Sequence, residues 1–146
     1  MATSSQRKGS DYERALADHI NKATGLKTAH RAPLSGGGKV GMAGGADILG
    51  TPDLFIEAKR TERLNVREAL RQAETNVSKT NAPERPVVIT RRNREAMGDS
   101  LVVMRLDDFL SVYRSHLLHT GVPTDDGRDD GRDEDLHILQ ADEAPI

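Results

Sequence analysis

Apolar residues recur at helical spacing in three segments of the chain, which places them on one face of each segment. The first segment covers residues 10–23, the second begins after Asn65 and the third begins at Asp107. Short runs of β-branched and other apolar residues lie between these segments and indicate strands. The order α-β-β-β-α-β-β-α predicts an α/β fold, a mixed β-sheet flanked by helices. The strands are expected at residues 26–34, 46–49, 54–59, 86–90 and 101–104.

Capping residues mark two of the expected helices. Ser10 and Glu13 have the spacing of a capping box, and Asn65 is expected to cap the second helix together with Glu68. Gly25 is placed to end the first helix. The third helix carries an apolar stripe that suits either core packing or a subunit interface. This stripe consists of Phe109, Leu110, Tyr113 and Leu117.

Composition limits the class of protein. A chain of 146 residues has the size of one domain. It has no cysteine, which excludes disulfides, thiolate zinc sites and a cysteine nucleophile. The first residues lack the hydrophobic stretch of a secretory signal, and no apolar run has the length of a membrane span. These features predict a soluble protein of a reducing compartment, the cytoplasm.

Charge is distributed unevenly along the chain. Residues 121–146 contain nine acidic and two basic side chains, a net charge of −7, which leaves +5 on residues 1–120 within the total of −2. The sequence Asp-Asp-Gly-Arg occurs twice in residues 125–132, where no apolar face is present. We therefore expect a folded domain at residues 1–120 and a disordered acidic tail at residues 121–146. The basic domain fits a polyanion partner, but an ordinary soluble surface explains it equally well.

The expected strand at residues 54–59 carries charged groups in an unusual position. Glu57 and Lys59 lie on the same face of a strand, because residues two apart point the same way. Two charges on an apolar strand are costly under a covering layer, but they suit a cleft that binds a cation and an anion. Asp47, on the preceding strand, brings a second carboxylate. With a backbone carbonyl, that of Ala58, two carboxylates form a set of hard oxygen ligands for Mg²⁺. The alternative is a surface ion pair of Glu57 and Lys59.

Four stretches of the sequence resemble the motifs of PD-(D/E)XK nucleases, and among them those of archaeal-type Holliday-junction resolvases. They lie at residues 7–14, 30–36, 45–49 and 55–59, with the sequences RKGSDYER, HRAPLSG, GADIL and FIEAK. The resemblance implies a restriction-endonuclease-like fold and hydrolysis of phosphodiester bonds with Mg²⁺, for which Mn²⁺ would substitute. It also implies a homodimer that acts on branched DNA.

The resemblance also assigns roles to individual residues. Asp47, Glu57 and the Ala58 carbonyl correspond to the metal ligands, and Lys59 to the catalytic lysine. Glu13 resembles an acid of the first helix that supports the metal, often through water, a role that competes with helix capping. Ser35 resembles a loop serine near the scissile phosphate. The residues expected to contact DNA are Lys8, Arg31, Ser35, Lys39 and Gln72.

The first half of the motif departs from the family pattern. The family often has Pro-Asp where this chain has Ala46-Asp47, and a literal Pro52-Asp53 occurs four residues before Glu57. Four residues leave little room to place both acids on adjacent strands, which favours Asp47 over Asp53. Substrate choice also stays open at this point. Holliday junctions or other branched DNA are expected, the alternatives being a nuclease for ends, nicks or flaps and a non-catalytic DNA-binding module on the same fold.

Overall fold

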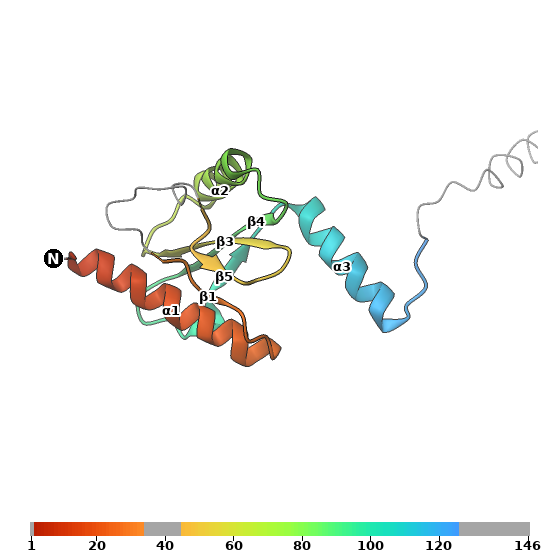
Figure 1. The fold of residues 1–146 in the computed structure, drawn as a ribbon, viewed down its shortest axis with the longest axis horizontal. Helices are drawn as coiled ribbons and strands as arrows, with labels where there is room; N and C mark the ends of the chain where they lie inside the picture. Colours follow the sequence, from red (N-terminus) through yellow and green to blue (C-terminus); the bar gives the residue numbers. More distant parts are fainter. Residues whose placement is uncertain (1, 34–44, 126–146) are drawn as a thin grey trace, which may run out of the picture. The chain divides into compact units, whose positions relative to one another are not determined.

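The computed structural model describes residues 2–33 and 45–125 (Figure 1). The chain divides after Asp108 into two units. The first unit contains α1 (Ser4–Thr24), α2 (Val66–Thr80) and the sheet, and most of α3 (Leu106–Thr120) belongs to the second. The predicted order of helices and strands is confirmed, with a short 3₁₀ helix, η2 (Met97–Asp99), added before the last strand. Within the described residues, no helix combines the length and the apolar character needed to cross a membrane.

Five strands form one mixed sheet in the order β1-β2-β3-β4-β5. β3, the central strand, runs parallel to its neighbour β4, and α2 connects the two, as a parallel pair requires a crossover. The other neighbouring pairs are antiparallel. The strands are β1 (His30–Arg31), β2 (Ile48–Leu49), β3 (Leu54–Arg60), β4 (Arg85–Arg91) and β5 (Leu101–Val103).

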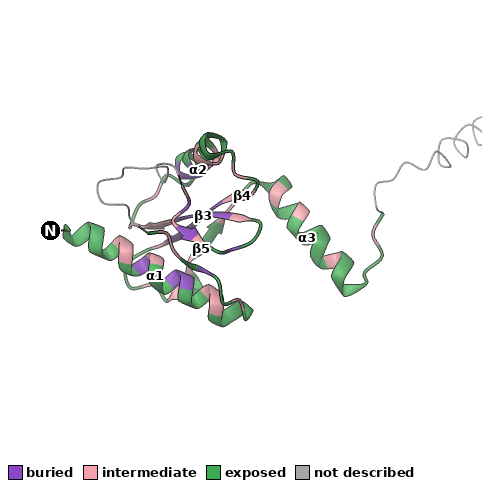
Figure 2. Cartoon of the chain, viewed as in Figure 1, coloured by how far each residue is buried: buried purple, intermediate pink, exposed green. Residues whose placement is uncertain are grey.

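α1 and α2 cover opposite faces of the sheet (Figure 1), and the buried residues lie where each helix meets it (Figure 2). Because side chains alternate along each strand, the buried apolar residues form two clusters, one against α1 and one against α2. Ile56 belongs to the α1 cluster, whereas Val88 belongs to the α2 cluster. Glu57, the residue after Ile56, therefore faces α2. The α1 cluster contains Tyr12, Leu16, Ala17, Ala29, Ile48, Ile56, Val87 and Ile89, and the α2 cluster contains Ala69, Leu70, Ala73 and Val88.

The predicted start of the first helix is wrong. α1 begins at Ser4, and its capping box is formed by Thr3 and Gln6, each accepting a hydrogen bond from the other's backbone N–H. Ser10 and Glu13 lie inside the helix and bind a strand residue instead. Two other capping predictions are confirmed. Gly25 ends α1 in the left-handed conformation, and Asn65 accepts from the Glu68 N–H.

The strand predicted at residues 26–34 is shorter, and in the described residues only His30–Arg31 pairs. Asn21 of α1 supplies the physical reason. Its side-chain amide donates to the Ala29 carbonyl at 2.8 Å and accepts from the Ala29 N–H at 3.0 Å. The backbone of Ala29 is thus satisfied by a side chain, so it does not need a neighbouring strand.

α3 confirms the predicted helix, and none of its residues is buried. The exposed fractions of Phe109 and Tyr113 are 49% and 46%. The rings of Phe109, Tyr113 and His116 stack along the helix, with centroids 6.0 and 6.3 Å apart.

The turn between β2 and β3 requires a glycine at position 50. Gly50 has φ +72°, and an added Cβ would lie 1.9 Å from the carbonyl oxygen of Thr28. We expect Gly50→Ala to lower the free energy of unfolding by about 3 kcal/mol or more. Gly25→Ala is the matched control, because Gly25 has φ +79° but open space around a Cβ, and it should cost about 1 kcal/mol. Urea denaturation measures both, and equal losses would contradict this reading.

Candidate active site

Asp47 is fixed immediately before β2 by hydrogen bonds on both sides of its backbone. Its N–H donates to the Ile56 carbonyl at 2.9 Å, and its carbonyl accepts from the Ala32 N–H at 2.8 Å. Its carboxylate Oδ2 accepts from the Ala58 N–H at 2.8 Å, where β2 no longer pairs with β3. The carboxylate is therefore held at the edge of β3. Asp47 also lies close enough to Glu57 for its charge to raise the pKa of that carboxyl.

Glu57 is buried between β3 and α2, with an exposed fraction of 7%. Asn76 of α2 donates from Nδ2 to Glu57 Oε1 at 3.2 Å. Burial raises the pKa of Glu57 to about 8, and the neighbouring Asp47 carboxylate acts in the same direction. A carboxyl group with these surroundings favours a proton or a cation at pH 7.

Lys59 and the Ala58 backbone extend the same site. Lys59 is partly buried and lies on the Glu57 face of β3, where its charge favours the ionised form of Glu57. The backbone groups of strand residues two apart face the same edge. Because Ile56 and the Ala58 N–H both bind Asp47, the Ala58 carbonyl is directed to that edge as well. The structure thus brings together Asp47, Glu57, Lys59 and the Ala58 carbonyl.

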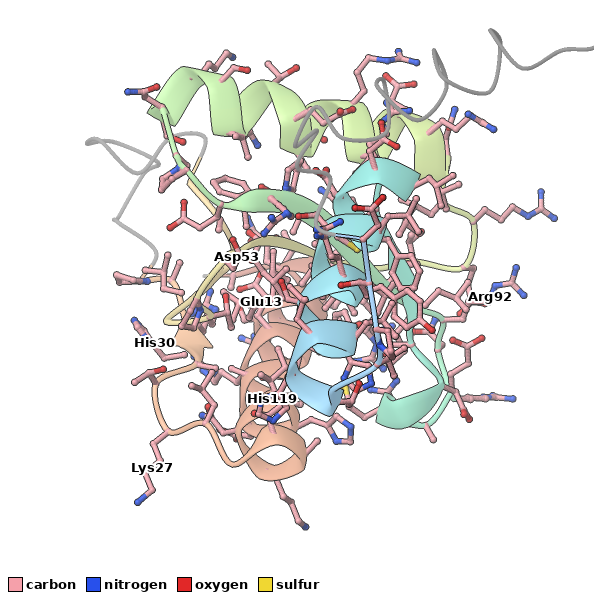
Figure 3. The ribbon with its side chains drawn as sticks, turned by 90° about the vertical axis from the view of Figure 1, so that its right-hand side faces the viewer. Glu13, Lys27, His30, Asp53, Arg92 and His119 are labelled. Atoms are coloured by element: carbon pink, nitrogen blue, oxygen red, sulfur yellow. The ribbon has the colours of Figure 1, made fainter. Side chains whose placement is uncertain are left out.

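Glu13, labelled in Figure 3, is partly buried on α1 and senses the charge of Asp47. Its Oε2 lies 2.6 Å from Arg31 Nε, and the same guanidinium donates to Ser10 Oγ at 2.9 Å. Burial raises the pKa of Glu13, the bond from Arg31 opposes this rise, and the charge of Asp47 adds to it. Glu13 therefore lies within electrostatic reach of Asp47. The Arg31 side chain, 15% exposed, is engaged inside the protein.

The donor set at this edge of the sheet fits a divalent cation. Two carboxylates and a carbonyl are hard oxygen ligands of the kind that Mg²⁺ and Mn²⁺ bind, with the remaining positions left to water or phosphate. A cation would also neutralise the two neighbouring carboxylates of Asp47 and Glu57. In the described part of the chain, no three acidic, histidine or cysteine side chains form a complete metal-binding group.

Asp53, the alternative acid, lies at the opposite end of β3. It precedes Leu54 in the turn, with φ +73°, and its carboxylate forms an ion pair with Arg85. The Asp53 side chain is 62% exposed. Its backbone carbonyl accepts from the Arg85 N–H at 2.9 Å, which ties the start of β3 to the start of β4. The bonds of Asp53 to Arg85 thus give it a structural role in the pairing of β3 with β4.

The other residues predicted from the sequence to contact DNA do not join this group in the described structure. Lys8 and Gln72 are exposed on α1 and α2. Ser35 and Lys39, like the tail beyond Asp125, lie outside the described residues. Sequence reasoning missed Asn76, which directly contacts Glu57. The signal available for it was its helical position, three residues after the fully buried Ala73.

The chain was compared with family models, with curated proteins and with solved structures. The model of a family described as "Phage putative PDDEXK endonuclease" matches residues 4–143. No curated protein matches the chain. No solved structure matches it either. The matched region includes both helices that flank the sheet, all five strands and every residue of the candidate site.

Proposed function

The chain belongs to the phage putative PDDEXK endonuclease family, and on that premise we propose that it is a divalent-metal-dependent endonuclease for branched DNA. Membership of this family makes it a hydrolytic nuclease with a restriction-endonuclease-like fold, whose substrate is DNA. The observation that supports the metal dependence is the pair formed by the buried Glu57 and the partly buried Asp47, beside the Ala58 carbonyl and Lys59. Two ionised carboxylates at this site repel each other, so at neutral pH the pair favours a bound proton or a cation.

In the proposed mechanism, Asp47, Glu57 and the Ala58 carbonyl hold the cation, and Mn²⁺ substitutes for Mg²⁺. The bound cation would activate a water molecule and neutralise charge on the phosphate. Lys59 is placed to stabilise negative charge that develops on the phosphate oxygens. Glu13, held by Arg31, contributes a further negative charge near Asp47 and orients water in the outer part of the site.

DNA contacts are assigned to Lys8, Lys39, Ser35 and Gln72, in addition to the catalytic residues. Arg31 was expected to contact DNA, but its bonds to Glu13 and Ser10 favour a role inside the site. The net charge of +5 on residues 1–120 supports binding of a polyanion, since phosphate neutralisation provides most non-specific affinity for DNA.

A substrate panel tests the proposed function. The protein is incubated with a four-way junction, a flap, a nicked duplex, a linear duplex and a single strand, in Mg²⁺ or in EDTA. We expect cleavage in Mg²⁺ and not in EDTA, with the four-way junction cut fastest. A preference for flaps or ends would favour the second candidate function, a nuclease for these structures. Binding without cleavage of any substrate would favour a DNA-binding module.

We also propose that the protein is a homodimer, since paired incisions in a two-fold symmetric junction require two active sites. The apolar stripe of α3, in which Phe109, Leu110 and Tyr113 are exposed, supports this proposal, because a row of exposed apolar side chains is typical of an interaction surface. Light scattering is expected to give twice the chain mass at micromolar concentration. Phe109→Lys should shift the mass toward the monomer, whereas Arg114→Lys, an exposed position on the same helix, should not. A monomeric wild type would contradict the dimer.

A further inference from the structure

One polar side chain of α2 is directed at the sheet. The inward side of this helix is otherwise apolar, with Ala69, Leu70 and Ala73 packed against Val88. Asn76 follows Ala73 by three residues and is partly buried. In the described residues, the Asn76 amide makes no hydrogen bond to the backbone of the sheet. Packing and backbone satisfaction therefore do not require an amide here, and an apolar residue would serve. The contact that the amide makes is with Glu57 Oε1, at 3.2 Å.

This contact constrains a long and flexible side chain. A glutamate has three rotatable bonds, and fixing them at the moment of ligand binding costs entropy. The Nδ2 donor occupies a lone pair of Oε1 and leaves the second carboxylate oxygen for another partner. Asp47 is held in an equivalent way, since the Ala58 N–H binds its Oδ2 at 2.8 Å. Each carboxylate of the pair thus has one fixed oxygen.

We propose that Asn76 is a positioning residue, which holds the Glu57 carboxylate in the orientation that accepts a divalent cation. The inference rests on the proposed function, because it assumes a cation between Asp47 and Glu57. Residues that hydrogen-bond to metal ligands typically change metal affinity or activity by about 10- to 100-fold when they are substituted. Asn76 acts through Glu57 and makes no contact with DNA in this role.

The test measures Mn²⁺ binding without DNA, by calorimetry, in the full-length protein. Asn76→Leu keeps the approximate size of the side chain and removes its donor, and Asn76→Ala removes it with a strong helix former that protects folding. Thr75→Leu is the matched control, because Thr75 is exposed and its hydroxyl binds only the Arg71 carbonyl of its own helix in the described structure. We expect the Kd for Mn²⁺ to increase about 10- to 100-fold in both Asn76 variants and to be unchanged in Thr75→Leu.

A second readout separates positioning from a general structural role. In cleavage assays, the Asn76 variants should need a higher Mg²⁺ concentration for half-maximal rate, while the Kd for DNA measured in EDTA stays at the wild-type value. Wild-type Mn²⁺ affinity in both Asn76 variants would overturn the inference alone. A wild-type protein that binds no Mn²⁺ would overturn the proposed function together with it.

Discussion

Replacing Asp47 by Asn, Glu57 by Gln or Lys59 by Ala is expected to lower the rate of DNA cleavage at least about a hundredfold, or about 3 kcal/mol of transition-state stabilisation. Each substitution removes one charge from the site in which Asp47 and Glu57 face each other beside Lys59. DNA affinity in EDTA should change little, because it comes mainly from phosphate contacts elsewhere on the protein. Single-turnover cleavage and fluorescence anisotropy measure the two quantities separately.

Asp53→Asn is the control for this prediction. It removes a carboxylate that lies at the far end of β3 and pairs with Arg85, so it should leave the cleavage rate near the wild-type value. The opposite pattern, full activity in Asp47→Asn and loss of activity in Asp53→Asn, would assign the metal to the literal Pro52-Asp53 pair. Near-wild-type rates in all three active-site variants would reject the site as a whole.

Strand periodicity predicted which face of β3 carries Glu57 and Lys59. Alternation along β3 placed Glu57 and Lys59 on one face, and the structure has them there, with Glu57 facing α2. The choice between Asp47 and Asp53 needed the exact pairing of β2 with β3. In the structure Ile48 lies opposite Ile56, so Asp47 reaches Glu57 while Asp53 remains in the turn. Sequence spacing favours Asp47 but cannot supply this register.

Contacts between elements that are distant in the sequence could not be predicted from local sequence patterns. Two motifs in the first helix, Thr3 with Gln6 and Ser10 with Glu13, satisfy the same local capping rule. Only the structure shows that the first caps the helix and that the second pair binds Arg31. The first turns of α1 are exposed, so apolar periodicity gave no sign of them. The contact of Asn76 with Glu57 depends on how α2 is rotated on the sheet, which no local pattern encodes.

The second large effect concerns stability without metal. The pKa of Glu57 is raised by burial from its usual 4.5 to about 8, so the folded state binds this proton more tightly than the unfolded state. The contribution of this protonated carboxyl to the stability of the folded state is fully present below about pH 4.5 and is lost as the pH rises toward 8. A tenfold change in proton affinity corresponds to about 1.4 kcal/mol, so the loss amounts to a few kcal/mol.

Glu57→Gln should therefore stabilise the metal-free protein above pH 8, because a neutral amide replaces a buried charge, even though it abolishes cleavage. Thermal unfolding in EDTA between pH 5 and 9 measures this, and Glu68→Gln, an exposed acid on α2, is the control for the loss of one charge. Mn²⁺ should raise the Tm of the wild type more at pH 8 than at pH 6, since the cation displaces the Glu57 proton at the lower pH. It should not raise the Tm of Glu57→Gln. Parallel Tm profiles of wild type and Glu57→Gln in EDTA would show that Glu57 carries no buried charge, and the electrostatic argument for a cation between Asp47 and Glu57 would then fail.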